Sequence, residues 1–180
     1  SHTSFARTPG SDDGTKSTAS SSLLALTSYL TALSFTEEGD IPLCVQEKLP
    51  KQWISFAKEL DITLPGGKAV TFGQSLYWVP QDLPDLARLK VLRPGLELGE
   101  VKKDRFEPAH ALALWLGDCR NVQSYPADSQ QIDAYLHGNV VPSQKKGWCL
   151  VAADGYSLGW GKGDGTVLKN HYPKGLRRLG

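Results

Sequence analysis

The sequence contains no methionine and only three cysteines among its 180 residues. Cys44, Cys119 and Cys149 are an odd number at wide spacing, so we expect neither a disulfide framework nor a paired-cysteine zinc site. Few scattered cysteines fit the reducing cytoplasm better than a secreted protein. Because no residue is a natural initiator, we also expect an excised segment of a longer protein, and such a segment need not carry its parent's chemistry.

Long apolar runs are missing as well. A membrane-spanning helix needs about 20 consecutive apolar residues. The longest apolar stretch, residues 23–33, is interrupted by serine and threonine and has no basic flank before it, so neither a membrane span nor a signal peptide is predicted. A hydrophobic fraction of 40% and a mean hydropathy of −0.30 are typical of a soluble protein that can bury a core.

Catalytic and metal-binding motifs are also lacking. No glycine-rich fingerprint opens a helix, and residues 159–163 resemble a phosphate loop in composition only, because they lie in a strand pattern. The four histidines share no ligand spacing with one another or with a cysteine, so no metal site is expected. None of the cysteines has the setting of an activated nucleophile, and we interpret them as small buried hydrophobic residues. No catalytic residue is therefore predicted.

Charge is unevenly distributed along the chain. The net charge is +1, but residues 145–180 contain seven basic and two acidic residues, a net charge of +5 that leaves −4 for the rest. This asymmetry points to a polyanion as partner, with a solvated basic face as the alternative.

The first half of the chain predicts a small connector. Residues 1–22 are rich in serine, threonine, glycine and aspartate and indicate a flexible linker or the remnant of a preceding domain. Helical spacing follows over 23–35 and 51–60. The buried stripe expected for the second helix consists of Trp53, Ile54, Phe56, Ala57 and Leu60. Residues 68–72 and 75–79 then predict a hairpin with a type II′ turn at Gly73-Gln74. We assign residues 23–88 to this α+β connector domain.

The second half predicts a small mixed barrel. Strands are expected at 89–92 and 96–101, and helices at 111–116 and 129–136. Three closing strands, 148–153, 158–162 and 166–169, are joined by Asp154-Gly155 and Asp164-Gly165. The fold class is therefore α+β, with residues 89–180 as a mixed β-barrel.

Two basic clusters are candidates for binding RNA. The tail, residues 169–178, interleaves cations with aromatic rings, and such groups neutralise phosphates and stack on unpaired bases. Tyr172, before Pro173, is equally explained as a core plug that holds the tail to the barrel. The second cluster is Lys102, Lys103 and Arg105, with a solvated loop as the alternative.

Two long motifs resemble a known family. Residues 92–114 read LRPGLELGEVKKDRFEPAHALAL and are similar to the region after the catalytic domain in bacterial RNA cytosine-5 methyltransferases of the NOL1/NOP2/Sun family, of the type called 16S rRNA methyltransferase F. Residues 154–162 (DGYSLGWGK) and 168–177 (LKNHYPKGLR) resemble that family's C-terminal PUA-like domain. The likeness spans residues 70–178 and is weakest between 116 and 146.

The resemblance implies a function that composition does not show. The parent enzyme would use S-adenosylmethionine to methylate C5 of a cytosine in small-subunit ribosomal RNA through a covalent cysteine adduct. The PUA-like part, 89–180, would recruit or orient that RNA. The cofactor-binding domain and its cysteine motifs are absent, so no cofactor is expected in this chain, and no catalytic role passes to its cysteines.

The implied partners are ribosomal RNA and the catalytic domain of the same parent, with no membrane. The alternative is a structural module that braces the catalytic domain without touching RNA. By position in the matching motifs, the resemblance adds these RNA-contact candidates: Lys162, Lys169, Asn170, His171, Tyr172, Lys174 and Arg177.

Overall fold

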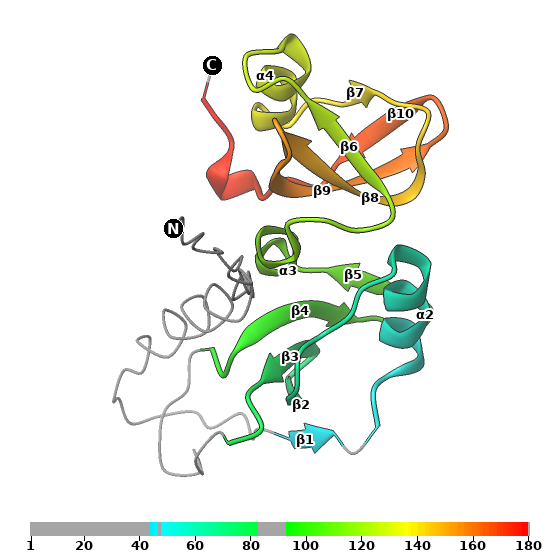
Figure 1. Ribbon diagram of the computed structural model, residues 1–180, viewed down its shortest axis with the longest axis vertical. Coiled ribbons are helices and arrows are strands. Elements are labelled where there is room, and N and C mark those ends of the chain that lie inside the picture. The colour runs from blue at the N-terminus through cyan, green and yellow to red at the C-terminus, as the bar shows by residue number, and fades with distance from the viewer. Residues whose placement is uncertain (1–43, 47, 83–92, 180) are drawn as a thin grey trace, which may run out of the picture.

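The computed structural model describes residues 44–46, 48–82 and 93–179 (Figure 1). The expected linker at 1–22, the helix at 23–35 and the strand at 89–92 lie outside these residues. The elements in chain order are β1 (Cys44–Gln46), α2 (Lys51–Leu60), β2 (Lys68–Phe72), β3 (Ser75–Val79), β4 (Leu96–Val101), β5 (Phe106–Pro108), α3 (His110–Leu116), β6 (Val122–Tyr125), α4 (Gln130–Leu136), β7 (Val141–Pro142), β8 (Lys146–Ala153), β9 (Tyr156–Asp164), β10 (Val167–Asn170) and the 3-10 turn η1 (Lys174–Leu176).

The strands form two five-stranded sheets. The first has the order β1-β2-β3-β4-β5 and is antiparallel throughout. The second has the order β6-β8-β9-β10-β7, in which only the β6–β8 pair is parallel. Figure 1 shows the first sheet in the lower half, the second in the upper half, α3 between them and α4 beyond the second sheet. The α+β prediction is confirmed.

The division between the sheets differs from the boundary expected at residue 89. Leu96 of β4 pairs with Trp78 of β3, and β4 in turn pairs with β5. The first sheet therefore continues to Pro108, and the second begins only with β6, after α3. Strand patterning at 96–101 carries no information about which neighbour a strand pairs with, so the sequence alone did not reveal this pairing.

Helix α2 has the bounds that its apolar spacing predicts. Trp53, Phe56 and Leu60 are buried, as expected for three residues on one helical stripe. The inclusion of Ile54 in that stripe is wrong, because its side chain is 51% exposed. It follows Trp53 by one position, which is about 100° around the helix and away from the core. None of the helices in the described part of the chain is long and apolar enough to cross a membrane.

The turns follow the chemistry of their residues. Gly73 has φ of 62°, as the first central position of a type II′ turn requires. Asp154 and Gly155 have φ of 49° and 84°, so both central residues of the β8–β9 turn are left-handed. At the β9–β10 turn the carboxylate of Asp164 accepts hydrogen bonds from the backbone N–H groups of Thr166 (2.9 Å) and Val167 (3.0 Å).

One hydrophobic core is shared by both sheets. Strand alternation sends Trp148 and Leu150 of β8, with Trp160 of β9, toward the first sheet, where they join Phe56 of α2 and the buried residues of β4 and α3. The opposite face of the second sheet packs a separate cluster against α4. The Trp160 indole N–H also donates a 2.9 Å hydrogen bond to the Ala109 carbonyl before α3. The two halves are therefore joined by packing as well as by the chain.

Replacing Trp160 tests this shared core. We expect Trp160→Ala to lower the free energy of unfolding by about 3–5 kcal/mol, because it leaves a cavity between the sheets. Urea unfolding followed by fluorescence and by circular dichroism should give one coincident transition. The control is Leu114→Ala, since Leu114 is 51% exposed on α3, and it should change stability by less than about 0.5 kcal/mol. Two separate transitions in the unchanged protein would contradict a shared core.

Candidate nucleic-acid interface

A row of cationic and aromatic side chains crosses the second sheet. Trp148 of β8 is opposite Lys162 of β9, and Lys162 is opposite Lys169 of β10. Directly opposed residues project from the same face of a sheet. The Lys162 ammonium nitrogen lies 5.4 Å from the Trp148 ring centroid, and the His171 ring lies 4.6 Å from it. We call these four residues, Trp148, Lys162, Lys169 and His171, the cationic row.

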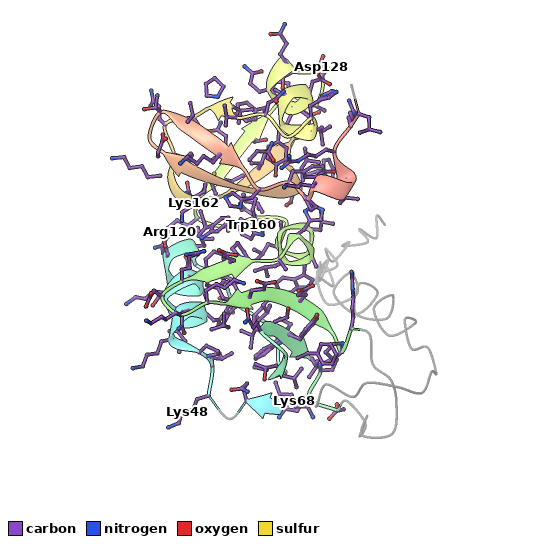
Figure 2. All side chains as sticks on the ribbon, turned by 180° about the vertical axis from the view of Figure 1, so that it is seen from behind. Lys48, Lys68, Arg120, Asp128, Trp160 and Lys162 are labelled. Atoms are coloured by element: carbon purple, nitrogen blue, oxygen red, sulfur yellow. The ribbon has the colours of Figure 1, made fainter. Side chains whose placement is uncertain are left out.

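The row lies where the two halves meet. It is on the face of the second sheet that carries Trp160 and the shared core, at the end where Lys162 and Lys169 are exposed. Figure 2 shows Lys162 and Trp160 at the level of this junction, with Lys48 and Lys68 at the far end of the molecule.

The glycines of β9 serve packing on the other face. A Cβ at Gly161 would lie 2.5 Å from the Leu168 side chain, and one at Gly159 would lie 2.7 Å from the Tyr135 hydroxyl. Glycine is required there because side chains from β10 and α4 approach the backbone closely. Close packing therefore explains the glycines at both positions.

The second predicted cluster forms the β4–β5 turn beside the row. The Lys102 ammonium pairs with the Glu100 carboxylate, and the Arg105 Nε donates to Glu107 Oε1 at 2.8 Å. Lys103 is exposed and makes no side-chain hydrogen bond or ion pair with the residues that the structure describes. The Gln52 side-chain amide donates to the carbonyls of Lys102 (3.3 Å) and Lys103 (3.1 Å), which holds the turn against α2.

A groove of about 400 Å³ separates α2 from this turn. Its lining comes from Lys51, Gln52, Ser55, Phe56 and Glu59 of α2, from residues 103–106, and from Trp148. We call it the α2 groove. Because Trp148 also belongs to the cationic row, the groove and the row form one continuous surface across both sheets.

Three candidate residues of the tail instead hold the chain end in place. The Asn170 side-chain amide donates to the carbonyls of Tyr135 (2.8 Å) and Asn139 (2.9 Å), and its oxygen accepts from the Tyr172 backbone N–H (2.8 Å). The Tyr172 ring packs 5.4 Å from the Tyr135 ring, as in the alternative of a core plug. The Arg177 guanidinium donates to the Tyr172 carbonyl at 3.2 and 3.3 Å.

Successive residues of an extended chain project to opposite faces of a sheet, which explains why neighbouring tail residues have different roles. Lys169 and His171 share the face of the cationic row, whereas Asn170 and Tyr172 face α4. Lys174 lies further on, exposed in η1, and forms no ion pair with any residue of the described part. Of the ten predicted RNA contacts, the structure therefore brings together Lys162, Lys169 and His171 with the turn residues Lys102, Lys103 and Arg105.

Electrostatics within the surface favour a neutral His171. Burial lowers the pKa of its imidazole, and the Lys162 ammonium lowers it further, while the Glu107 carboxylate acts in the opposite direction. The neutral imidazole packs against the Trp148 ring while part of its surface stays exposed.

The two cysteine thiols that the structure describes, Cys119 and Cys149, are not activated. Burial raises the pKa of the fully buried Cys149 to about 11 and raises that of Cys119 as well. Nucleophilic catalysis by cysteine needs the thiolate, so these two environments oppose it. The side chain of Cys44 lies outside the described set. Among the described residues, no group of three or more His, Cys, Asp or Glu side chains is placed to hold a metal ion.

Sequence reasoning found Lys103 and Arg105 of the groove but missed Trp148 and the residues that α2 supplies. These lay only within the expected strand at 148–153 and the expected helix at 51–60. The four-residue spacing of Lys51, Ser55 and Glu59 was a signal that they share one side of the helix. Nothing in the sequence indicated that this side faces the β4–β5 turn.

Comparison with protein-family models identifies both halves. Residues 55–116 match the first C-terminal domain of the RsmF rRNA methyltransferase, and residues 122–178 match the PUA domain of methyltransferase RsmF. The two matches meet where the first sheet and α3 end and the second sheet begins. The fold and the matches define accessory domains of an rRNA methyltransferase. The chain belongs to the C-terminal region of the RsmF-type enzymes, which confirms the family resemblance and the PUA-like fold.

The tail hydrogen bonds predict opposite results for adjacent residues. Asn170→Ala should lower the free energy of unfolding by about 1–3 kcal/mol, because two carbonyls and one N–H lose their partner. Lys169→Ala removes an exposed side chain and should stay within about 0.5 kcal/mol of the unchanged protein. Urea unfolding measures both, and equal losses would show that Asn170 does not hold the tail.

The position of His171 in the cationic row also predicts how the stability of the fold depends on pH. Because the folded pKa of His171 lies below its ordinary value, the unfolded chain binds the proton first as pH falls. The contribution of His171 to stability is thus complete above about pH 6.5 and decreases as pH falls toward its folded pKa. NMR titration of the imidazole should show a higher pKa in Lys162→Ala, since a repelling charge is removed. The control, Lys174→Ala, should leave the pKa of His171 unchanged. If Lys162→Ala also leaves it unchanged, Lys162 does not lie close enough to repel the protonated imidazole.

Proposed function

We propose that this chain is the non-catalytic, RNA-recruiting C-terminal region of an S-adenosylmethionine-dependent rRNA cytosine-5 methyltransferase that acts on small-subunit RNA in the cytoplasm. The observation that carries the proposal is the cationic row beside the β4–β5 turn. Lys162 and Lys169 are exposed on one face and form no ion pair with described residues, so they are available to phosphates.

The chemistry of the parent belongs to another domain in this proposal. A catalytic domain of the same chain would bind the cofactor and supply the nucleophilic cysteine. The raised pKa values of Cys119 and Cys149 support that division, because neither thiol is a ready nucleophile at neutral pH. The fixed junction of the two halves supports a role in presenting RNA at a constant orientation.

Salt-dependent binding tests the RNA role. For single strands, each phosphate contact contributes about 0.7 to the slope of log affinity against log salt. Lys162→Ala with Lys169→Ala should therefore weaken binding of a single-stranded small-subunit rRNA oligonucleotide and flatten the slope by about 1.4, measured by fluorescence anisotropy. The matched control, Lys48→Ala with Lys68→Ala, removes the same charge at the far end of the molecule (Figure 2) and should leave the slope nearly unchanged.

Equal slopes for both double variants would overturn the assignment of the row. Binding to the separately produced catalytic domain without any RNA binding would favour the bracing module instead. Methyl transfer from labelled S-adenosylmethionine by this chain alone would contradict the non-catalytic role.

A further inference from the structure

The α2 groove has an aromatic floor next to the cationic row. Phe56, Phe106 and Trp148 all line it, and the Phe56 ring centroid lies 5.1 Å from that of Phe106 and 6.5 Å from that of Trp148. Its volume of about 400 Å³ falls within the range of small-molecule sites, about 300–1,000 Å³. The three rings are 4%, 4% and 9% exposed, so the floor is a small apolar surface, which suits a base better than a phosphate.

The rim of the groove combines cations with two carboxylates, Glu59 of α2 and Asp104 of the β4–β5 turn. Lys51, Ser55 and Glu59 follow one another at four-residue spacing along α2, and Lys103 lies across the groove. Within the part of the chain that the structure describes, the Ser55 and Glu59 side chains form no hydrogen bond or ion pair. A Cβ at Gly147 would lie 2.7 Å from Glu59 Oε1, so the carboxylate reaches the start of β8, next to Trp148.

An unpaired carboxylate in the groove favours a nucleobase over a phosphate of the RNA backbone. It repels phosphate but accepts hydrogen bonds from the amino and imino groups of nucleobases, as acidic side chains do with the cytosine amino group. Trp148 connects the groove with the lysines of the cationic row. An RNA strand that follows the row can therefore place one base beside α2 without losing its phosphate contacts.

We propose that the α2 groove takes one unpaired base of the bound RNA, with Glu59 accepting hydrogen bonds from the amino edge of that base. This inference rests on the proposed RNA-recruiting function and adds the kind of nucleotide that is recognised. Bases that carry an exocyclic amine are preferred to uracil, whose two carbonyl oxygens flank its single imino group and repel the carboxylate.

Abasic substitution tests occupancy of the groove. In a set of single-stranded oligoribonucleotides with one abasic site each, one position should cost about tenfold in affinity, since a stacked base contributes about 1–3 kcal/mol. Ser55→Leu, which narrows the groove with a side chain that cannot stack, should lose a similar factor and become insensitive to that abasic site. The salt slope should stay unchanged. Ile54→Leu introduces the same side chain one residue away, outside the groove lining, and should bind like the unchanged protein.

Glu59→Gln tests base selection at the same position. The carboxamide can donate as well as accept, so the preference of an amino-bearing base over uracil should fall from about tenfold to near one. If Ser55→Leu keeps full sensitivity to the abasic site, or Glu59→Gln keeps the base preference, the groove inference is overturned. The proposed function would still stand if the Lys162 and Lys169 double variant flattens the salt slope. It fails, and this inference with it, if the unchanged protein binds none of these RNAs.

Discussion

The aromatic contact between Phe56 of α2 and the tryptophans of the second sheet fixes the geometry of the whole surface. Ring centroids lie 5.7 Å apart for Phe56 and Trp160, and 6.4 Å apart for Trp148 and Trp160. Buried aromatic rings of this size dominate the energy of a core. Because Phe56 of α2 packs with residues of β4 and β5 in the same core as the two tryptophans of the second sheet, the β4–β5 turn and the cationic row keep a constant separation. A binding surface that spans two domains needs this rigidity, since otherwise the two parts would have to be ordered again by each RNA.

A single extra residue in β9 determines from which face of the second sheet Lys162 projects. Counting from the Asp154-Gly155 turn, an unbroken hairpin would pair Ala153 with Tyr156 and, further along, Trp148 with Gly161. The register shifts by one between Val151 and Ala152, so that Trp148 pairs with Lys162 instead. A one-residue shift moves every following side chain to the other face of the sheet. Without the bulge, Lys162 would point toward the cluster under α4.

Local chemistry was therefore predictable, and pairing at a distance was not. The bounds of α2, the type II′ turn at Gly73 and the two Asp-Gly turns follow from spacing and from residues that tolerate left-handed backbone. The pairing of β4 with β3 and the parallel pairing of β6 with β8 could not be predicted, because the sequence of a strand does not indicate which other strand it pairs with. The α2 groove depends on the first of these pairings, because its two walls approach each other only after the first sheet is assembled. For the same reason Asn170 was read as an RNA contact, since its acceptors are carbonyls of α4 and the following loop.

Net charge was a poor guide to this surface because several acidic groups of the chain are already paired with other cations. Glu100 holds Lys102 and Glu107 holds Arg105, and Asp61 and Asp133 hold Arg120 and Arg178. In the described part of the chain, the lysines along the groove and the row (Lys51, Lys103, Lys162 and Lys169) have no such partner. A chain with a net charge of +1 can thus present several unpaired cations on one face, because the field that a phosphate meets depends on local pairing and not on the total. Glu59 and Asp104 are the carboxylates of the groove, and neither forms an ion pair with the described residues. An unpaired carboxylate on a basic rim is what makes a base, and not only a backbone, the expected occupant.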